Sequence, residues 1–88
     1  MKADREAIKR LLRTAGGQID GIVRMVEEDK YCLDISNQIM ACEAVLKKTN
    51  KEILRAHMEN CVRQSLKSGS QEDSDRKIRE LLDLLGKM

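Results

Sequence analysis

The sequence contains no proline, phenylalanine or tryptophan, and Tyr31 is its single aromatic residue. Because proline is absent, every residue has the backbone N–H donor that a helix interior requires. The apolar residues are mainly leucine, isoleucine, valine, methionine and alanine, which are mostly good helix formers and pack well between helices. Charged residues make up 36% of the chain, the mixture expected of exposed helix faces. The composition therefore predicts an all-α protein.

The N-terminus has no apolar signal-peptide core, and no apolar run approaches membrane-spanning length. We therefore expect a cytoplasmic protein, in which reducing conditions make the three cysteines metal ligands, redox sensors or core residues rather than disulfides. The sequence shows no Ser/His/Asp arrangement, no phosphate-binding glycine loop and no paired carboxylates in an apolar pocket. We predict that the chain is not an enzyme.

The formal net charge of +2 is too small to indicate a partner, but the charges are unevenly distributed. Residues 1–24 and residues 42–67 each carry six basic and three acidic residues, whereas residues 27–34 carry four acidic residues and one basic residue. The two basic zones could form one positive surface after folding and assembly. They could equally be two solvated helix faces, and charge alone leaves both interpretations open.

Three helices are predicted within one domain, residues 1–88. Apolar residues recur every three to four positions from about 4 to 28, from 32–34 to about 67, and from about 75 to 85. The long central helix would span roughly 50 Å, more than a globule of 88 residues can cover, so we expect it to pack on another chain. Gly16 and Gly17 weaken the first helix by about 1 kcal/mol each relative to alanine, a cost that close helix packing would offset.

His57 and Cys61 lie four residues apart on the central helix, so they share a face and can bind one ion together. Cys32 precedes His57 by 25 residues, which is about seven helical turns, and projects from the same face. Along one helix, however, Cys32 and His57 are roughly 37 Å apart. Two antiparallel copies that cross near Val45 and Leu46 would bring Cys32 of one copy beside His57 and Cys61 of the other. This predicts a symmetric dimer with two equivalent metal sites between subunits.

Two thiolates and one imidazole form a soft donor set that favours Cu(I). Zn(II) would require a fourth ligand, and Ni(II) or Co(II) would require more nitrogen or oxygen donors. Taken one at a time, the three residues favour core packing, but their shared face and symmetric placement together favour a metal site. Cys42 lies about 80° around the helix from Cys32, and we predict a core position for it. The same prediction applies to Met25, Met40 and Met58.

The pattern Tyr31-Cys32, followed by His57-x3-Cys61, resembles the copper-sensing operon repressor (CsoR) family, which is related to the RcnR and FrmR sensors. The resemblance covers nearly the whole chain, with further matches at Gly17-Gln18, Gly21-Ile22, Asp34-Ile35, Gln38-Ile39 and Ile78-x-Glu80-Leu81-Leu82. It implies a three-helix protomer without a helix-turn-helix, an antiparallel dimer and a dimer-of-dimers tetramer. It also implies that the apo protein binds operator DNA and that Cu(I) releases it, derepressing copper export or homeostasis genes.

The resemblance implies a role for several further residues. The metal ligands would be Cys32 of one chain with His57 and Cys61 of the other, and Tyr31 and Glu80 would link the ligand histidine to the third helix. The positions before Gly17-Gln18 depart from the arginine-rich pattern of the family. The candidate DNA-binding residues are therefore Lys9, Arg10, Arg13, Gln18 and Lys48.

Other functions fit parts of the pattern. A persulfide-sensing repressor would link Cys32 and Cys61 of different chains through sulfur, but it would not need His57. Nickel or cobalt sensing would call for an N-terminal histidine, which this sequence does not have. The presence of Cys61 and the absence of proline argue against formaldehyde sensing. A cytosolic copper-binding protein without a DNA role would need an exposed site, and a structural coiled-coil adaptor would leave the Cys/His/Cys placement to chance.

Overall fold

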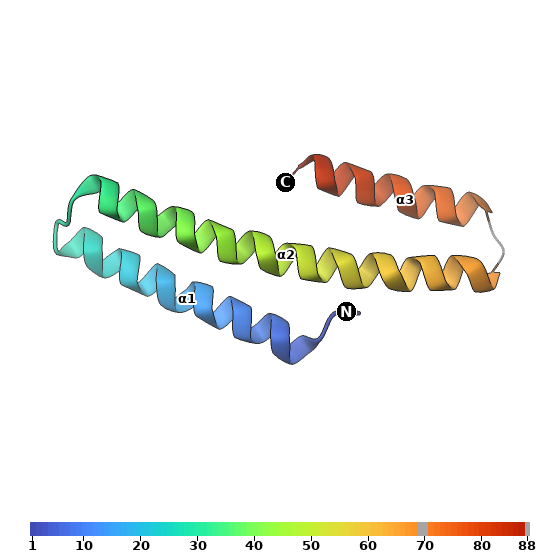
Figure 1. Cartoon of the computed structure of the whole chain (residues 1–88), viewed down its shortest axis with the longest axis horizontal. Helices are drawn as coiled ribbons and strands as arrows, with labels where there is room; N and C mark the ends of the chain where they lie inside the picture. Colours follow the sequence, from blue (N-terminus) through green and yellow to red (C-terminus); the bar gives the residue numbers. More distant parts are fainter. Residues whose placement is uncertain (69–70, 88) are drawn as a thin grey trace. The chain divides into compact units, whose positions relative to one another are not determined.

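A computed structural model describes residues 1–68 and 71–87, and within these ranges the chain forms three helices. Helix α1 covers Arg5–Glu27, α2 covers Cys32–Ser68 and α3 covers Gln71–Gly86 (Figure 1). The predicted all-α class and the long central helix are confirmed. Helix α3 begins four residues before the predicted start, because apolar periodicity does not register the polar first turn. Glu72 in that turn is favourable beside the positive end of the helix dipole.

The start of α1 is fixed by Asp4, whose side chain caps the helix. Asp4 Oδ1 accepts hydrogen bonds from the backbone N–H of Glu6 at 3.0 Å and of Ala7 at 3.3 Å. These bonds satisfy two of the N–H groups that have no partner inside the helix, and the carboxylate also complements the helix dipole.

A Schellman motif ends α1 and turns the chain toward α2. Asp29 has a φ of 56°, a left-handed conformation that glycine usually supplies. The Lys30 N–H donates to the Met25 carbonyl at 2.9 Å, and the Asp29 N–H donates to the Val26 carbonyl at 3.1 Å. Because the motif is compact, only residues 28–31 separate α1 from α2, and the first residue of α2 is the exposed Cys32.

Residues 4–50 form one compact unit, made of α1 and the first part of α2. Its most buried residues are Ile8, Ala15, Cys42 and Thr49. The Cys42 thiol donates a long hydrogen bond of 3.7 Å to the Ala15 carbonyl, and the Thr49 hydroxyl donates to the Val45 carbonyl at 2.8 Å. The predicted core position of Cys42 is confirmed.

Residues 1–3 and 51–88 form the second unit, which contains the last part of α2 together with α3. Among its described residues, only Cys61 and Leu81 are buried. Many large apolar side chains of the chain stay exposed, including Met40, Met58 and Leu82, so the core position predicted for Met40 and Met58 is wrong within one protomer. This exposure supports assembly with a second copy. The single domain and the dimer that the sequence predicts remain predictions.

Within the described ranges, no helix has the length and apolarity needed to cross a membrane.

We expect Gly16→Ala and Gly17→Ala to stabilise the isolated protomer. A Cβ atom added at either glycine would meet nothing within 4 Å, so packing inside this chain does not require them. Each substitution should raise the free energy of unfolding by about 1 kcal/mol, because alanine is the better helix former. Urea denaturation checks this at protein concentrations low enough to suppress assembly. A loss of stability would instead indicate that another molecule packs closely on these glycines.

Candidate metal centre

One turn of α2 brings the donor atoms of His57 and Cys61 together. Cys61 Sγ lies 3.6 Å from His57 Nε2. Cys61 is buried and His57 is exposed, so one donor is held by packing while the other reaches the surface. The predicted pairing of these two residues on one helix face is therefore present within a single chain.

The spacing of the two donor atoms fits a shared metal ion. For a tetrahedral zinc ion, with metal–sulfur and metal–nitrogen bonds of about 2.3 and 2.0 Å and an angle near 110°, the donor atoms are about 3.5 Å apart. The separation of 3.6 Å between Cys61 Sγ and His57 Nε2 is close to that value. Coordination through Nε2 would leave Nδ1–H free to donate a hydrogen bond to another group.

The third predicted ligand, Cys32, is the exposed first residue of α2. Twenty-five residues of continuous helix separate it from His57, which corresponds to about 37 Å. Within residues 1–68 and 71–87, no three His, Cys, Asp or Glu side chains gather as a metal site. One chain thus supplies two of the three predicted ligands at one place, and the contribution of Cys32 from a second chain remains a prediction.

The two residues expected to surround the ligand histidine are Tyr31 and Glu80. Both are exposed, and the side chain of neither makes a hydrogen bond or ion pair within the described residues. Tyr31 uses its backbone carbonyl to accept from the N–H groups of Asp34 and Ile35 at the start of α2. The predicted link from His57 through Glu80 to α3 remains a prediction.

The predicted DNA-binding residues differ in their surroundings. Arg10, Arg13 and Lys48 are exposed and make no ion pair within the described part of the chain. Lys9 lies 3.7 Å from the Glu6 carboxylate, in a pair that solvent weakens. Gln18 is half-buried, and its Oε1 atom is buried without a hydrogen-bond partner. Arg10, Arg13 and Lys48 are therefore the cations best placed to meet phosphate.

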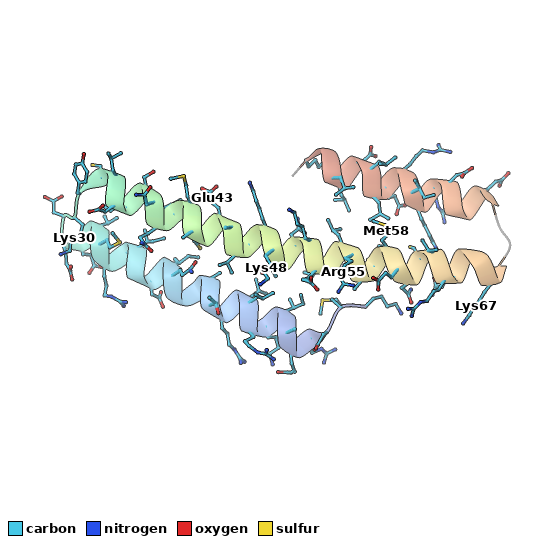
Figure 2. The ribbon with its side chains drawn as sticks, viewed as in Figure 1. Lys30, Glu43, Lys48, Arg55, Met58 and Lys67 are labelled. Carbon is cyan, nitrogen blue, oxygen red and sulfur yellow. The ribbon has the colours of Figure 1, made fainter. Side chains whose placement is uncertain are left out.

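Arg55 belongs to the second basic zone, residues 42–67. Its guanidinium donates to Glu52 Oε2 at 2.9 Å and to Glu59 Oε1 at 2.8 Å. The hydrogen bond to Glu52 and then that to Glu59 raise the pKa of Arg55 above its ordinary value. The i−3 and i+4 spacing of the two glutamates could have revealed this cluster. Arg55 is therefore already engaged by two carboxylates, and both it and Lys48 project from α2 (Figure 2).

Comparison with known proteins gives consistent matches. The copper-sensing transcriptional repressor CsoR of Bacillus subtilis (strain 168) is 39% identical over 84 residues, which cover 96% of this chain and 80% of that relative. CsoR of Mycobacterium tuberculosis (strain ATCC 25618 / H37Rv) is 36% identical over 83 residues, covering 94% of this chain and 67% of that relative.

Two solved structures share the fold. The copper-sensing repressor CsoR with Cu(I) from Geobacillus thermodenitrificans NG80-2 matches with a TM-score of 0.80 and 33% identity, covering 93% of this chain and 82% of that chain. The nickel-responsive transcriptional regulator InrS matches with a TM-score of 0.87 and 25% identity, covering 94% and 93% of the two chains. A family model described as "Metal-sensitive transcriptional repressor" matches residues 4–87. The chain therefore belongs to the family of metal-sensitive transcriptional repressors, as its resemblance to the copper-sensing operon repressors predicted.

Proposed function

We propose that this protein is a Cu(I)-responsive transcriptional repressor whose apo form binds operator DNA and whose Cu(I) form leaves it. The observation that carries the proposal is the 3.6 Å separation of Cys61 Sγ and His57 Nε2 on α2. A thiolate and an imidazole at that spacing suit a soft metal ion, and the relatives named for copper sensing support Cu(I).

Cys32 of a second copy would complete the site. The exposed position of Cys32 at the start of α2 leaves its thiol accessible to another chain. An antiparallel pairing of two α2 helices would bring it beside the partner copy's His57 and Cys61. Cu(I) would then bridge the two chains, so that the position of one chain relative to the other would depend on metal binding. The many exposed apolar side chains of a single chain support such a dimer and its further assembly into a tetramer.

The DNA-binding surface would be built from the unpaired cations of residues 4–50. Arg10 and Arg13 on α1 and Lys48 on α2 can each neutralise a phosphate of double-stranded DNA. In a symmetric assembly each protomer carries these three cations, so several copies of them would face one operator.

The function is tested by measuring DNA release. Operator fragments are selected from a random-sequence library with the apo protein, and their binding is followed by gel shift under anaerobic, reducing conditions. We expect Cu(I) to release the DNA at one equivalent per protomer. Release by Ni(II) or by polysulfide instead, with no response to Cu(I), would reject copper sensing. An absence of DNA selection by the apo protein would favour a copper-binding protein without a DNA role.

Lys48→Ala and Arg13→Ala should weaken binding of the apo protein to the selected DNA. Removing one cation that neutralises a phosphate should lower the slope of log K against log salt concentration by roughly 0.9. Arg55→Ala serves as the control, because its guanidinium is already engaged by Glu52 and Glu59 and we expect no change in the slope. Affinity and salt dependence are measured by fluorescence anisotropy. Wild-type slopes for Lys48→Ala and Arg13→Ala would exclude both residues from the DNA interface.

A further inference from the structure

Helix α2 carries a stripe of exposed side chains with the spacing of a coiled-coil seam. Residues separated alternately by four and three positions lie in one stripe along a helix and can pack against a second helix. Counted from the first residue of α2, this spacing gives Cys32, Ser36, Ile39, Glu43, Leu46, Asn50, Ile53 and His57, here called the α2 seam. All of these residues except Ile53 are exposed in the protomer. The α2 seam is therefore open to a second copy of the chain.

Glu43 places a negative charge in the middle of the α2 seam. Its neighbours along the seam are Ile39 and Leu46, which are apolar and 43% exposed. Figure 2 shows Glu43 on the side of α2 away from α1. The Glu43 carboxylate makes no hydrogen bond or ion pair within the described part of the chain. Because a carboxylate buried without a partner is costly, a second copy that covers the seam must supply a donor to it.

The register proposed for the metal site determines what lies opposite Glu43. In that register, Cys32 of one copy lies beside His57 and Cys61 of an antiparallel second copy. Glu43 is eleven residues after Cys32, so its opposite position is eleven residues before His57 and Cys61. Glu43 therefore lies opposite residues 46–50 of the second copy.

The stretch opposite Glu43 contains two hydrogen-bond donors. They are the ammonium group of Lys47 and the side-chain amide of Asn50. Both side chains are exposed, and neither makes a hydrogen bond or ion pair within the described residues. Lys47 also follows Glu43 by four residues in its own chain, yet the two form no ion pair there. Both donors are therefore available to the carboxylate of a second copy.

Other pairings of two α2 helices do not supply these donors. A shift by one heptad would place Glu43 opposite residues 39–43, which are apolar apart from the second copy's Glu43. A shift in the other direction would place it opposite residues 53–57, whose single arginine, Arg55, is already bound by two carboxylates of its own chain. A parallel pairing in register would bring the two Glu43 carboxylates together. A polar seam residue that finds its partner in one register specifies that register.

We infer that the Glu43 carboxylate fixes the antiparallel register of two α2 helices by accepting hydrogen bonds from Lys47 and Asn50 of a second copy. This inference rests on the dimer of the proposed function, since the register is the one that assembles the metal site. Glu43 is a positioning residue, because it holds Cys32 beside the ligands of the other chain without touching the metal. Two-fold symmetry forms the same contacts twice in each dimer.

Two charge reversals test the contact between chains. In a dimer of Glu43→Lys chains, position 43 meets Lys47 of the second copy as a like charge, and the same holds in a dimer of Lys47→Glu chains. A mixed dimer replaces these with opposite charges between chains, while the like charges within each helix remain. The two variants, one of them isotope-labelled, are refolded together, and native mass spectrometry counts the dimers. We expect the equilibrium constant for mixing to exceed the statistical value by about tenfold or more, which is about 1.4 kcal/mol.

The matched control makes the same charge reversals outside the α2 seam. Glu6 and Lys9 form an exposed ion pair on α1, with 3.7 Å between the Lys9 ammonium and the Glu6 carboxylate. Glu6→Lys and Lys9→Glu chains should therefore mix statistically. If a dimer of either seam variant fails to form, the mixed sample should still dimerise. Statistical mixing of the seam variants, or an equal preference in the control, would overturn the inference.

Cu(I) binding separates this inference from the proposed function. Chelator competition should show Cu(I) binding by Glu43→Lys weakened by about tenfold or more, as for other groups that orient metal ligands, and restored in the mixed dimer. Wild-type Cu(I) affinity in Glu43→Lys would overturn the positioning role of Glu43 and leave the proposed function intact. A preference for mixed dimers in a protein whose wild-type form does not bind Cu(I) would overturn the proposed function and retain the contact between chains.

Discussion

Cys61→Ala is expected to abolish tight Cu(I) binding while the apo protein keeps its affinity for DNA. Cys61 supplies one of the two thiolates of the proposed site, 3.6 Å from His57 Nε2, and the imidazole and single thiolate that remain are too few soft donors to hold Cu(I) tightly. Chelator competition measures the metal affinity, and anisotropy measures DNA binding. Unchanged Cu(I) affinity in Cys61→Ala would reject the site.

Cys42→Ala is the matched control for this experiment. Both cysteines lie on α2 and are almost equally buried, with Cys42 at 6% and Cys61 at 7% exposure. Truncation to alanine should therefore leave comparable cavities and comparable losses of stability. Cys42 donates to the Ala15 carbonyl and lies 15 residues before His57, so its removal should leave Cu(I) affinity at the wild-type value.

A mixed dimer tests whether the site is shared between chains. Cys32→Ala chains keep His57 and Cys61, and His57→Ala chains keep Cys32. If the ligands come from two chains, the mixed dimer contains one intact site and binds one Cu(I) tightly. Complete loss of tight binding in the mixed dimer would reject a site shared between two chains.

His57→Ala is expected to separate metal binding from DNA release. Two thiolates can still bind Cu(I), but the imidazole is lost whose Nδ1–H could donate a hydrogen bond to a group outside the metal site. If Cu(I) releases this protein from DNA as proposed, metal and DNA bind antagonistically, with a coupling free energy of typically about 1–3 kcal/mol. We expect most of that coupling to disappear, so that copper-loaded His57→Ala stays on the DNA. Release by Cu(I) as complete as in the wild type would make His57 only a ligand.

Glu80→Ala examines the next step of the same route. When Nε2 binds copper, Nδ1–H can donate to a carboxylate, and Glu80 on α3 is the acceptor that the resemblance implies. We expect Cu(I) affinity to remain within about tenfold while the coupling falls by about 1 kcal/mol or more. DNA titrations with and without saturating Cu(I) give the coupling directly. If Glu80→Ala keeps the wild-type coupling free energy, Glu80 does not connect metal binding at His57 to DNA release through α3.

The sequence by itself determined the features that depend on spacing along a helix. The periodic apolar residues of α1 and α2 predicted both helices to within about one residue at each end, because 3.6 residues per turn govern which side chains share a face. The same rule predicted the His57–Cys61 pair, which needs only an i,i+4 spacing on one helix. Cys32 could be excluded from that turn because helical rise fixes its axial distance.

Only the tertiary structure decided which side chains are covered and which are paired. Cys42 and Met58 both lie on α2, yet Cys42 is buried in the unit formed with α1 and Met58 is exposed. Sequence spacing could not separate them, because burial depends on which face of α2 another helix covers. Asp29 takes a left-handed conformation that its residue type does not require, because the Schellman hydrogen bonds stabilise it. The empty space around Gly16 and Gly17 likewise follows from where α1 and α2 approach, which no local pattern along the chain encodes.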